Sequence, residues 1–267
     1  MTKERKYALL SVFDKTGIVE LANTLHKKGY LLISTGGTAK TLEQANIPII
    51  PIHTITGNPE SFDGRMKTIS FQIESGILYR RDRKSHVKDA KRLGVKKIDI
   101  VVCNLYPFEQ TLKNKRASHL DIVEQIDVGG PTMIRAAGKN HEHVLVVTNP
   151  DDYQSIIEKI TKDTITTSFR KELAAKAFQH LAFYDAQIGR YLSDNTYPNE
   201  LTLPARKGFK LRYGENPHQN PSYVYFDPQT RSPLSRLTKQ VGRELSYVNF
   251  TDIASGLEVV QQFKEPA

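Results

Sequence analysis

Two short loops of this 267-residue chain carry residues that could bind an anion. Residues 34–38 (STGGT) join an apolar run to a helical pattern. The glycines there can turn backbone N–H groups toward a ligand, and the helix N-terminus adds positive partial charge. Lys15 follows the first apolar run and could reach the same ligand. A Gly-Gly turn beside Thr can also be purely structural, but two such loops at one sheet edge favour a phosphate site.

Further along the chain lie residues that could hold the rest of a polar substrate. Arg65 and Lys67 form a basic pair beside the hydroxyl of Thr68. Asn104 and Tyr106 come at the end of a long apolar run. We expect all five side chains to add charge and hydrogen bonds at the same edge of the molecule. A lone Arg or Lys is more often a solvated surface charge, so the prediction depends on the ordered set.

A carboxylate and two lysines complete the group that could move protons. Asp127 precedes two glycines that allow close backbone approach to a ligand, and Lys139 ends the helical pattern that follows. A carboxylate close to Lys67 and Lys139 would shift the pKa values of all three groups and permit proton transfer near neutral pH. The alternative for Asp127 and Lys139 is a structural ion pair.

Apolar runs alternate with helical patterns over the first two thirds of the chain. Strands are predicted at residues 7–12, 30–34, 49–52, 98–105 and 143–148, and the main helices at 18–25, 39–44, 132–141 and 166–192. Short apolar strands separated by helices predict a parallel sheet with helices on both faces. In such a sheet, ligands bind at the carboxyl ends of the strands, which is where the residues above must lie.

The alternation stops at a turn-rich stretch, residues 195–207. We therefore predict one domain over residues 1–199 and the beginning of a second over residues 200–267. Fewer than 60 residues follow Lys207, which is too few for a complete second core.

The bulk composition excludes several classes of protein. The net charge of +9 could indicate a nucleic-acid-binding protein, but much of this charge lies in residues 80–97. That segment holds no Phe, Tyr or Trp for base stacking and no nucleic-acid-binding motif, so we expect a solvated helix face there. Cys103 is the only cysteine, so no intrachain disulfide or thiolate zinc cluster can form, and its apolar surroundings predict a buried strand position. No apolar run approaches the ~18 residues of a membrane span, and no signal peptide is found. A cytoplasmic location without nucleic-acid or membrane partners is expected.

The ordered motifs resemble one family closely. They are similar to the N-terminal part of the bifunctional purine-biosynthesis enzymes that combine 5-aminoimidazole-4-carboxamide ribonucleotide (AICAR) transformylase with inosine monophosphate (IMP) cyclohydrolase. The matching motifs occur in family order and cover nearly the whole chain: SVFDKTG (11–17), STGGTAKTL (34–42), GRMKT (64–68), CNLYPF (103–108), EQIDVGGPTMIRAAGKNH (124–141) and LRYGENPHQ (211–219).

The resemblance implies an α/β, methylglyoxal-synthase-like first domain, followed by an incomplete start of an α/β transformylase domain of the cytidine-deaminase-like kind. The implied activity is IMP cyclohydrolase, which closes the purine ring of 5-formamidoimidazole-4-carboxamide ribonucleotide to give IMP and water. This reaction needs no metal or organic cofactor. The transformylase would use 10-formyltetrahydrofolate, and its activity is expected to be absent from this chain. The expected partners are the nucleotide substrate and a second copy in a homodimer.

Site residues carry over from the family motifs by position. The implied catalytic group is Lys67, Tyr106, Asp127 and Lys139. The implied substrate-binding residues are Ser11, Lys15, Ser34, Thr35, Gly36, Gly37, Thr38, Arg65, Thr68, Cys103, Asn104 and Gly129. In the second domain, Arg212 and Tyr213 would help to bind the aminoimidazole substrate at an incomplete site.

The chain departs from the family pattern at several positions near the expected pocket. Phe13 replaces a usual Ser, Ser70 and Phe71 stand in a segment that usually reads Leu-His-Pro, and Glu74 occupies a further usual His position. These departures leave open a non-catalytic nucleotide-binding module of the same fold. A third interpretation is methylglyoxal synthase itself, against which the segments around Tyr106 and Asp127 argue.

Overall fold

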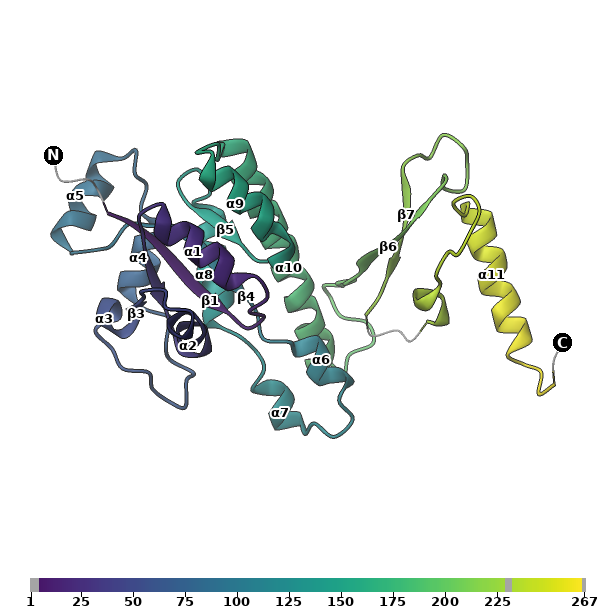
Figure 1. Ribbon diagram of the computed structural model, residues 1–267. Coiled ribbons are helices and arrows are strands. Elements are labelled where there is room, and N and C mark those ends of the chain that lie inside the picture. Colours follow the sequence, from purple (N-terminus) through teal and green to yellow (C-terminus); the bar gives the residue numbers. More distant parts are fainter. Residues whose placement is uncertain (1–4, 229–231, 266–267) are drawn as a thin grey trace. The chain divides into compact units, whose positions relative to one another are not determined.

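The computed structural model describes residues 5–228 and 232–265, and the chain divides into two compact units, Met1–Ile188 and Gly189–Ala267. The first unit holds a five-stranded, wholly parallel sheet with the strand order β3-β2-β1-β4-β5 (Figure 1). Its strands are β1 Lys6–Val12, β2 Tyr30–Ser34, β3 Ile50–Pro51, β4 Ile98–Asn104 and β5 Leu145–Val147. The order reverses at β1, so the carboxyl ends of β1 and β4 flank the point where this class of sheet binds ligands.

Helices cover both faces of the sheet. On one face, α1 (Ile18–Lys27) packs beside α9 (Tyr153–Thr161), and on the other α4 (Phe71–Leu78) packs beside α8 (Gly129–Lys139) (Figure 1). Successive side chains of β1 point to opposite faces of the sheet, so alternate residues of this strand contact different helix layers. Ala8, Leu10 and Val12 lie in one apolar cluster with the buried residues of α1 and α9. The remaining α-helices of the first unit are α2 Gly36–Gln44, α3 His53–Thr56, α5 Lys84–Arg92, α6 Phe108–Lys113, α7 His119–Val123 and α10 Thr167–Leu192, and a 3-10 turn, η1, spans Pro150–Asp152.

The predicted fold class is confirmed, and the strand predictions differ from the structure mainly at the sheet edges. The second strand matches residue for residue, whereas the two edge strands are shorter than predicted. β3 is only two residues long because the chain enters α3 at His53, and the Ile52 N–H still donates to the Ser34 carbonyl of β2 at 3.0 Å. The division between units falls at Ile188, inside α10, and the expected boundary between residues 199 and 200 stays a prediction.

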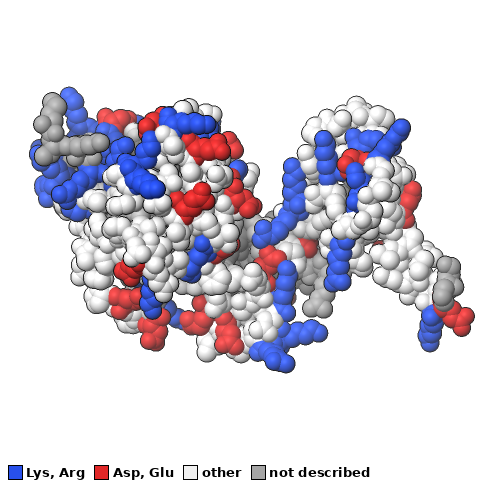
Figure 2. All heavy atoms as spheres, viewed as in Figure 1, with Lys and Arg blue, Asp and Glu red and all other residues white. Residues whose placement is uncertain are grey.

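The basic segment is divided between a surface helix and one half-buried arginine that joins two elements. Lys84, Lys88 and Lys91 of α5 are exposed, and Lys and Arg gather on the part of the surface where α5 lies (Figure 2). Arg81 behaves differently: its guanidinium donates to the carbonyls of Gly76, Ile77 and Tyr79 and, at 2.7 Å, to that of Ile98. These bonds satisfy carbonyls at the end of α4 and join that helix to β4. One charge of the segment is therefore structural.

The second unit holds little buried surface. An antiparallel pair, β6 (Arg206–Leu211) and β7 (Ser222–Phe226), is followed by a 3-10 turn, η2 (Pro233–Arg236), and by α11 (Tyr247–Val260). The Phe226 ring lies 5.7 Å from that of Phe209 and 6.4 Å from that of Phe250. The buried residues of its described part are Pro204, Leu211, Gly214 and Ser246. So few buried side chains do not make a complete hydrophobic core.

Every helix in the described part of the chain is too short or too polar to cross a bilayer. Residues 5–228 and 232–265 hold no group of three or more His, Cys, Asp or Glu side chains placed to bind a metal ion.

Candidate active site

The loops that follow β1 and β4 are tied together where the strand order reverses. The side-chain carbonyl of Asn104 accepts the N–H groups of Phe13 and Asp14 at 2.7 and 2.9 Å, and its amide donates to the Asp14 carbonyl at 2.9 Å. Asn104 was predicted to bind substrate. In the structure its whole amide group holds the loop that carries Lys15, which makes it a positioning residue.

The Thr35–Gly37 turn forms a cradle that two lysines approach. α2 begins at Gly36 without a side-chain cap, so the first backbone N–H groups of the helix are available to an anion. A Cβ placed on Gly36 would lie 2.8 Å from Lys67 Nζ, and one on Gly37 would lie 3.4 Å from Lys15 Cε. Both lysines therefore reach the turn that was predicted to bind an anion, although they lie on separate loops. Gly36 also has a φ of +53°, which favours glycine.

Two of the predicted substrate hydroxyls are already engaged inside the protein. Ser34 Oγ is buried and donates to the Leu10 carbonyl at 2.8 Å. Thr38 Oγ1 donates to the Val12 carbonyl and accepts the Val12 N–H, both at 2.9 Å. These bonds fasten β2 and α2 to β1, so the hydroxyls hold the cradle in shape. The groups that remain for the expected anion are Thr35, the backbone amides and the two lysines.

A small cavity opens beside this turn. It has a volume of about 140 Å³ and is lined by Thr35 and Gly36 together with His53, Glu60 and Lys67. Lys67 Nζ lies 3.8 Å from Glu60 Oε1 and its side chain is 22% exposed. The ammonium group of Lys67 is therefore partly shielded from water and close to the anion cradle.

Asp127 is a half-buried carboxylate close to the same lysine. Burial raises the pKa of its carboxyl, while hydrogen bonding from the Gly130 backbone, the charge of Lys67 and the backbone of Tyr106 pull that pKa in the other direction. Oδ1 of Asp127 accepts the Gly130 N–H at 2.8 Å at the start of α8. A Cβ on Gly130 would lie 2.7 Å from both Asp127 Oδ2 and Leu105 Cδ2, so glycine is required there. The structure thus brings Lys67, Tyr106 and Asp127 together.

The sequence prediction missed Tyr184, which anchors the segment that carries Asp127. Its hydroxyl accepts the Asp127 N–H at 2.8 Å and donates to the Gln125 carbonyl at 3.0 Å. Burial raises the pKa of this hydroxyl to about 12. Tyr184 lies within the helix predicted at residues 166–192. A buried Tyr hydroxyl needs a polar partner, so this residue type was the signal in the sequence that could have identified it.

Arg65 and Thr68 border the site without contacting the anion cradle. The guanidinium of Arg65 forms a bidentate ion pair with Glu124, in which Nε lies 3.3 Å from Oε2. Thr68 is buried, and its Oγ1 would lie 2.4 Å from a Cβ on Gly129, so α8 can begin there only with glycine. The N-terminal end of α8 therefore packs directly against the segment of Lys67.

Two aromatic rings stand at the exposed side of the site. Tyr106 is 44% exposed, and its ring lies 5.6 Å from that of Phe13. Lys15 Nζ lies 5.9 Å from the Phe13 ring centroid and donates to the Phe13 carbonyl at 3.1 Å. The aromatic residue that replaces the usual Ser thus contacts two expected site residues. Ser11 is half-buried in β1, and Cys103 is buried beside it in β4, where burial raises the pKa of the thiol.

Lys139 lies at the far end of α8 from Asp127. Gly129 begins that helix and Lys139 ends it, so their Cα atoms are about 15 Å apart along the axis at 1.5 Å per residue. The next residue, Asn140, donates to the carbonyls of Ile77 and Tyr79 at the end of α4. The helix therefore does not bring Lys139 together with Asp127. The catalytic role that the resemblance implies for Lys139 stays a prediction.

In the second unit, Arg212 and Tyr213 lie side by side after β6. The Arg212 guanidinium lies 4.9 Å from the Tyr213 ring centroid and donates to its hydroxyl at 3.2 Å. Neither residue lines the 680 Å³ hollow between β7 and α11 of this unit. Their role in binding a substrate stays a prediction.

The departures after Lys67 have local structural roles. Ser70 caps α4, since its Oγ accepts the Ile73 N–H at 3.2 Å. Glu74 lies one residue further along that helix, and burial raises the pKa of its carboxyl to about 7. Both of its carboxylate oxygens are buried without a hydrogen-bond partner in the described part of the chain.

Glu74→Gln is expected to stabilise the protein at pH 8 by about 1–2 kcal/mol and to have little effect near pH 4.5. The folded state binds this proton more tightly than the unfolded state does, so the free energy of unfolding falls as pH rises from about 4.5 through 7. A pKa shift of this size corresponds to about 3 kcal/mol for a fully buried group. The expected effect is smaller because solvent screens the charge of the partly exposed Glu74 side chain. Urea unfolding at both pH values measures the difference, with the exposed Glu158→Gln as control. Equal effects of the two substitutions at pH 8 would argue against a buried, unpaired Glu74.

Comparison with known proteins places this site in a class. A family model described as an MGS-like domain matches residues 17–132, which contain the cradle, Lys67, Tyr106 and Asp127. The crystal structure of ForH is similar to this chain with a TM-score of 0.62 and 33% identity, covering 69% of this chain and 95% of that one. The first unit is therefore an MGS-like α/β domain. A second model, the AICARFT/IMPCHase bienzyme, matches residues 137–267, and the chain belongs to that family.

Curated relatives match along nearly the whole chain. The bifunctional purine biosynthesis protein PurH of Oceanobacillus iheyensis is 44% identical over 265 residues, which are 98% of this chain and 52% of that protein. PurH of Clostridioides difficile is 46% identical over 263 residues, 97% of this chain and 51% of its own length. The chain thus spans about half the length of the curated relatives that it matches.

Proposed function

We propose that the first unit is an IMP cyclohydrolase, which converts 5-formamidoimidazole-4-carboxamide ribonucleotide to IMP and water. The observation that carries this proposal is the meeting of an anion cradle, Lys67 and the half-buried Asp127 at the carboxyl edge of the sheet. The cradle suits the phosphate of a ribonucleotide, and the lysine and carboxylate suit proton transfer at the other end. Membership of the bienzyme family supports the same assignment.

The reaction joins two groups of one substrate, so positioning supplies much of the acceleration. The carboxamide nitrogen attacks the formyl carbon, a C–N bond forms, and the formyl oxygen takes up negative charge. Lys67 protonates that oxygen, and Asp127 accepts the proton that the attacking nitrogen loses. The hydroxyl then leaves as water with the proton held by Asp127, while the neutral Lys67 takes the proton of the former formamide nitrogen. Both side chains return to their starting states, and no added reagent is consumed.

The raised pKa of Asp127 suits this role. A carboxylate that is partly desolvated is a stronger base than one in water, and the nearby charge of Lys67 keeps it ionised. Lys67 is in turn partly shielded and faces the anion cradle. Lys139 has no place in this direct exchange because it lies at the other end of α8.

In a crystal structure of the IMP complex, we expect the phosphate on the backbone amides of Gly36 and Gly37 with Lys15 beside it. The base should lie near Lys67 and the Tyr106 ring, where the aromatic pair with Phe13 provides a stacking surface. Difference density for the nucleotide is the measurement. A phosphate bound elsewhere on the protein would refute this placement.

The 267-residue chain is expected to show no AICAR transformylase activity. The described part of its second unit buries few side chains, so it cannot form a complete catalytic core alone. Formyl transfer from 10-formyltetrahydrofolate to the aminoimidazole nucleotide measures this directly. Turnover above background by this chain alone would contradict this expectation. It would show that the transformylase site assigned by resemblance to Arg212 and Tyr213 lacks residues that this chain does contain.

Other expectations from the sequence stay predictions. A homodimer is one of these predictions, and a cytoplasmic location, which is consistent with membership of a purine-biosynthesis family, is another. The ring closure as proposed uses side chains and backbone groups alone, without a metal or organic cofactor.

A further inference from the structure

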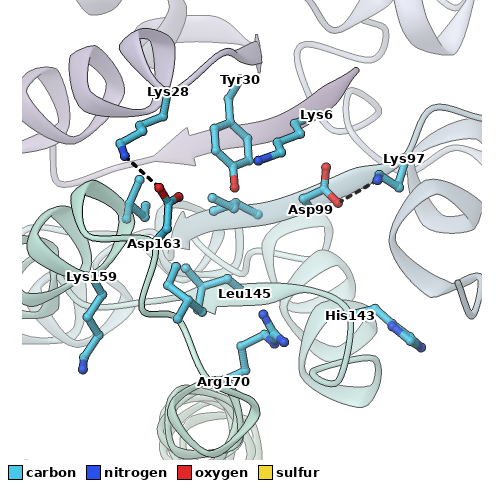
Figure 3. A pocket seen from close by; sticks show the side chains of 13 residues that line it. Lys6, Lys28, Tyr30, Lys97, Asp99, His143, Leu145, Lys159, Asp163 and Arg170 are labelled. Atoms are coloured by element: carbon cyan, nitrogen blue, oxygen red, sulfur yellow. Dashed lines mark hydrogen bonds and ion pairs between the residues drawn. The ribbon is translucent and has the colours of Figure 1, made fainter. Parts of the chain in front are cut away.

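A second hollow of the first unit lies at the edge of the sheet opposite the candidate active site. It has a volume of about 270 Å³ and is formed where β1, β2, β4 and β5 begin, closed on one side by the α9–α10 connection and the start of α10 (Figure 3). Apolar side chains, including Ile100, Leu145 and Ile160, form part of its lining. The candidate active site lies at the carboxyl ends of the same strands, so the two sites share no residue.

The lining of this hollow carries an excess of positive charge. Five Lys and Arg residues face two Asp residues: Lys6, Lys28, Lys97, Lys159 and Arg170 against Asp99 and Asp163. Each Asp is already paired, because Lys28 Nζ lies 3.1 Å from Asp163 Oδ2 and Lys97 Nζ lies 3.8 Å from Asp99 Oδ1 (Figure 3). The hollow therefore keeps more positive charge than its own carboxylates neutralise.

Three cations of the lining, Lys6, Lys159 and Arg170, form no ion pair within residues 5–228 and 232–265. Lys6 Nζ lies 5.4 Å from the Tyr30 ring centroid, and no ion pair to Lys6 is found in those ranges. Arg170 makes no ion pair there either, and its Nε is buried without a hydrogen-bond partner in the same ranges. Lys159 differs in direction, since its side chain points away from the centre of the hollow and its Nζ lies 4.7 Å from the Phe169 ring centroid (Figure 3). Lys6 and Arg170 are thus the two cations available to a ligand.

The hydroxyl of Tyr30 lies between these groups. Its pKa is raised by burial and by the charges of Asp99 and Asp163, and lowered by that of Arg170, so all three charges act on it. In Figure 3 the hydroxyl points into the hollow between the Asp99 and Asp163 carboxylates. A neutral Tyr hydroxyl can donate to an anion, which the two paired carboxylates cannot do.

We propose that this hollow is a second, non-catalytic binding site for a phosphomonoester or inorganic phosphate dianion, held by Lys6, Arg170 and the Tyr30 hydroxyl. Two cations without a carboxylate match the two charges of such a ligand. The Arg fork can bind phosphate oxygens in a bidentate manner, and the ammonium of Lys6, an exposed residue, adds a second positive charge. The volume is at the lower limit for a small-molecule site and suits a ligand the size of a triose or glycerol phosphate. This inference does not depend on what the first site does.

The test is a titration of the isotope-labelled chain followed by amide chemical shifts, at constant ionic strength. The probes are inorganic phosphate and glycerol 3-phosphate, which distinguish the free ion from an ester. We expect saturable shifts at residues 28–30, 97–99 and 163–170, separate from any shifts at residues 34–38. The double variant Lys6→Gln/Arg170→Gln should weaken binding at the first group of residues at least about tenfold, because two charge-assisted hydrogen bonds are lost.

The matched control removes two exposed lysines of α5 with the same change in net charge. Lys84→Gln/Lys88→Gln should leave the affinity at residues 28–30 and 163–170 within about twofold of the wild-type value, since exposed charges at a distance are screened. Equal loss in both double variants would overturn the proposal and indicate attraction by net charge alone. Shifts confined to residues 34–38, or shifts at this hollow that do not saturate, would also overturn it. Stronger binding of glycerol 3-phosphate than of phosphate would identify the ester as the ligand, and equal binding the free anion.

Discussion

The Lys67→Ala variant is expected to lose about a hundredfold to ten-thousandfold in kcat for ring closure, while its Kd for IMP changes less than about tenfold. Lys67 acts on charge that develops on the formyl oxygen in the transition state, whereas the phosphate is held by the cradle and Lys15. Steady-state kinetics on the formamido substrate and calorimetric titration with IMP measure the two quantities.

The control for this substitution is Lys40→Ala, which removes an exposed lysine from α2 and touches neither the cradle nor the proton-transfer groups. Its kcat and Kd are expected to match those of the wild type. If Lys67→Ala weakened IMP binding as much as it slowed turnover, Lys67 would be a binding charge and the proposed proton donation would be wrong.

The Asp127→Asn variant is expected to lose a similar factor in kcat, about a hundredfold to ten-thousandfold, and to remain folded. The Asn carbonyl can still accept the Gly130 N–H at the start of α8, so the local structure is kept while the base is removed. A buried carboxylate with a raised pKa destabilises the folded state at neutral pH, so the variant should be at least as stable as the wild type at pH 8.

The pH profile separates this role from a structural one. In the wild type, kcat should fall as pH drops through the raised pKa of Asp127, because only the ionised carboxylate can accept a proton. Asp127→Asn should lack that acidic limb, while the exposed Asp89→Asn should keep it. An unchanged acidic limb in Asp127→Asn would show that another group is the base.

The fold and the location of the candidate site could be predicted from the sequence because both follow from short-range patterns. Apolar runs and helical spacing indicate a parallel sheet, and the carboxyl edge of such a sheet gathers whatever follows each strand. Thr35, Lys15 and Lys67 therefore meet as expected, although they lie far apart along the chain.

The use of individual polar side chains could not be predicted in the same way. Ser34, Thr38 and Asn104 are polar residues at strand ends, and the structure uses their side chains for hydrogen bonds between loops. Whether a hydroxyl faces a ligand or a neighbouring carbonyl depends on strand register and on side-chain rotamers, which residue type does not determine. Lys139 illustrates a second limit. It lies in the same sequence motif as Asp127, but the continuous helix α8 separates the Cα atoms of Gly129 and Lys139 by about 15 Å.

The most direct measurement is ring closure by the purified chain, followed through the change in ultraviolet absorbance as an imidazole becomes a purine. With 5-formamidoimidazole-4-carboxamide ribonucleotide as substrate, we expect a rate proportional to protein concentration, retained in the presence of a metal chelator and reduced about a hundredfold to ten-thousandfold by Lys67→Ala. A folded chain that bound IMP at the cradle but produced no IMP above the uncatalysed rate would contradict the proposed function and would identify a non-catalytic nucleotide-binding module.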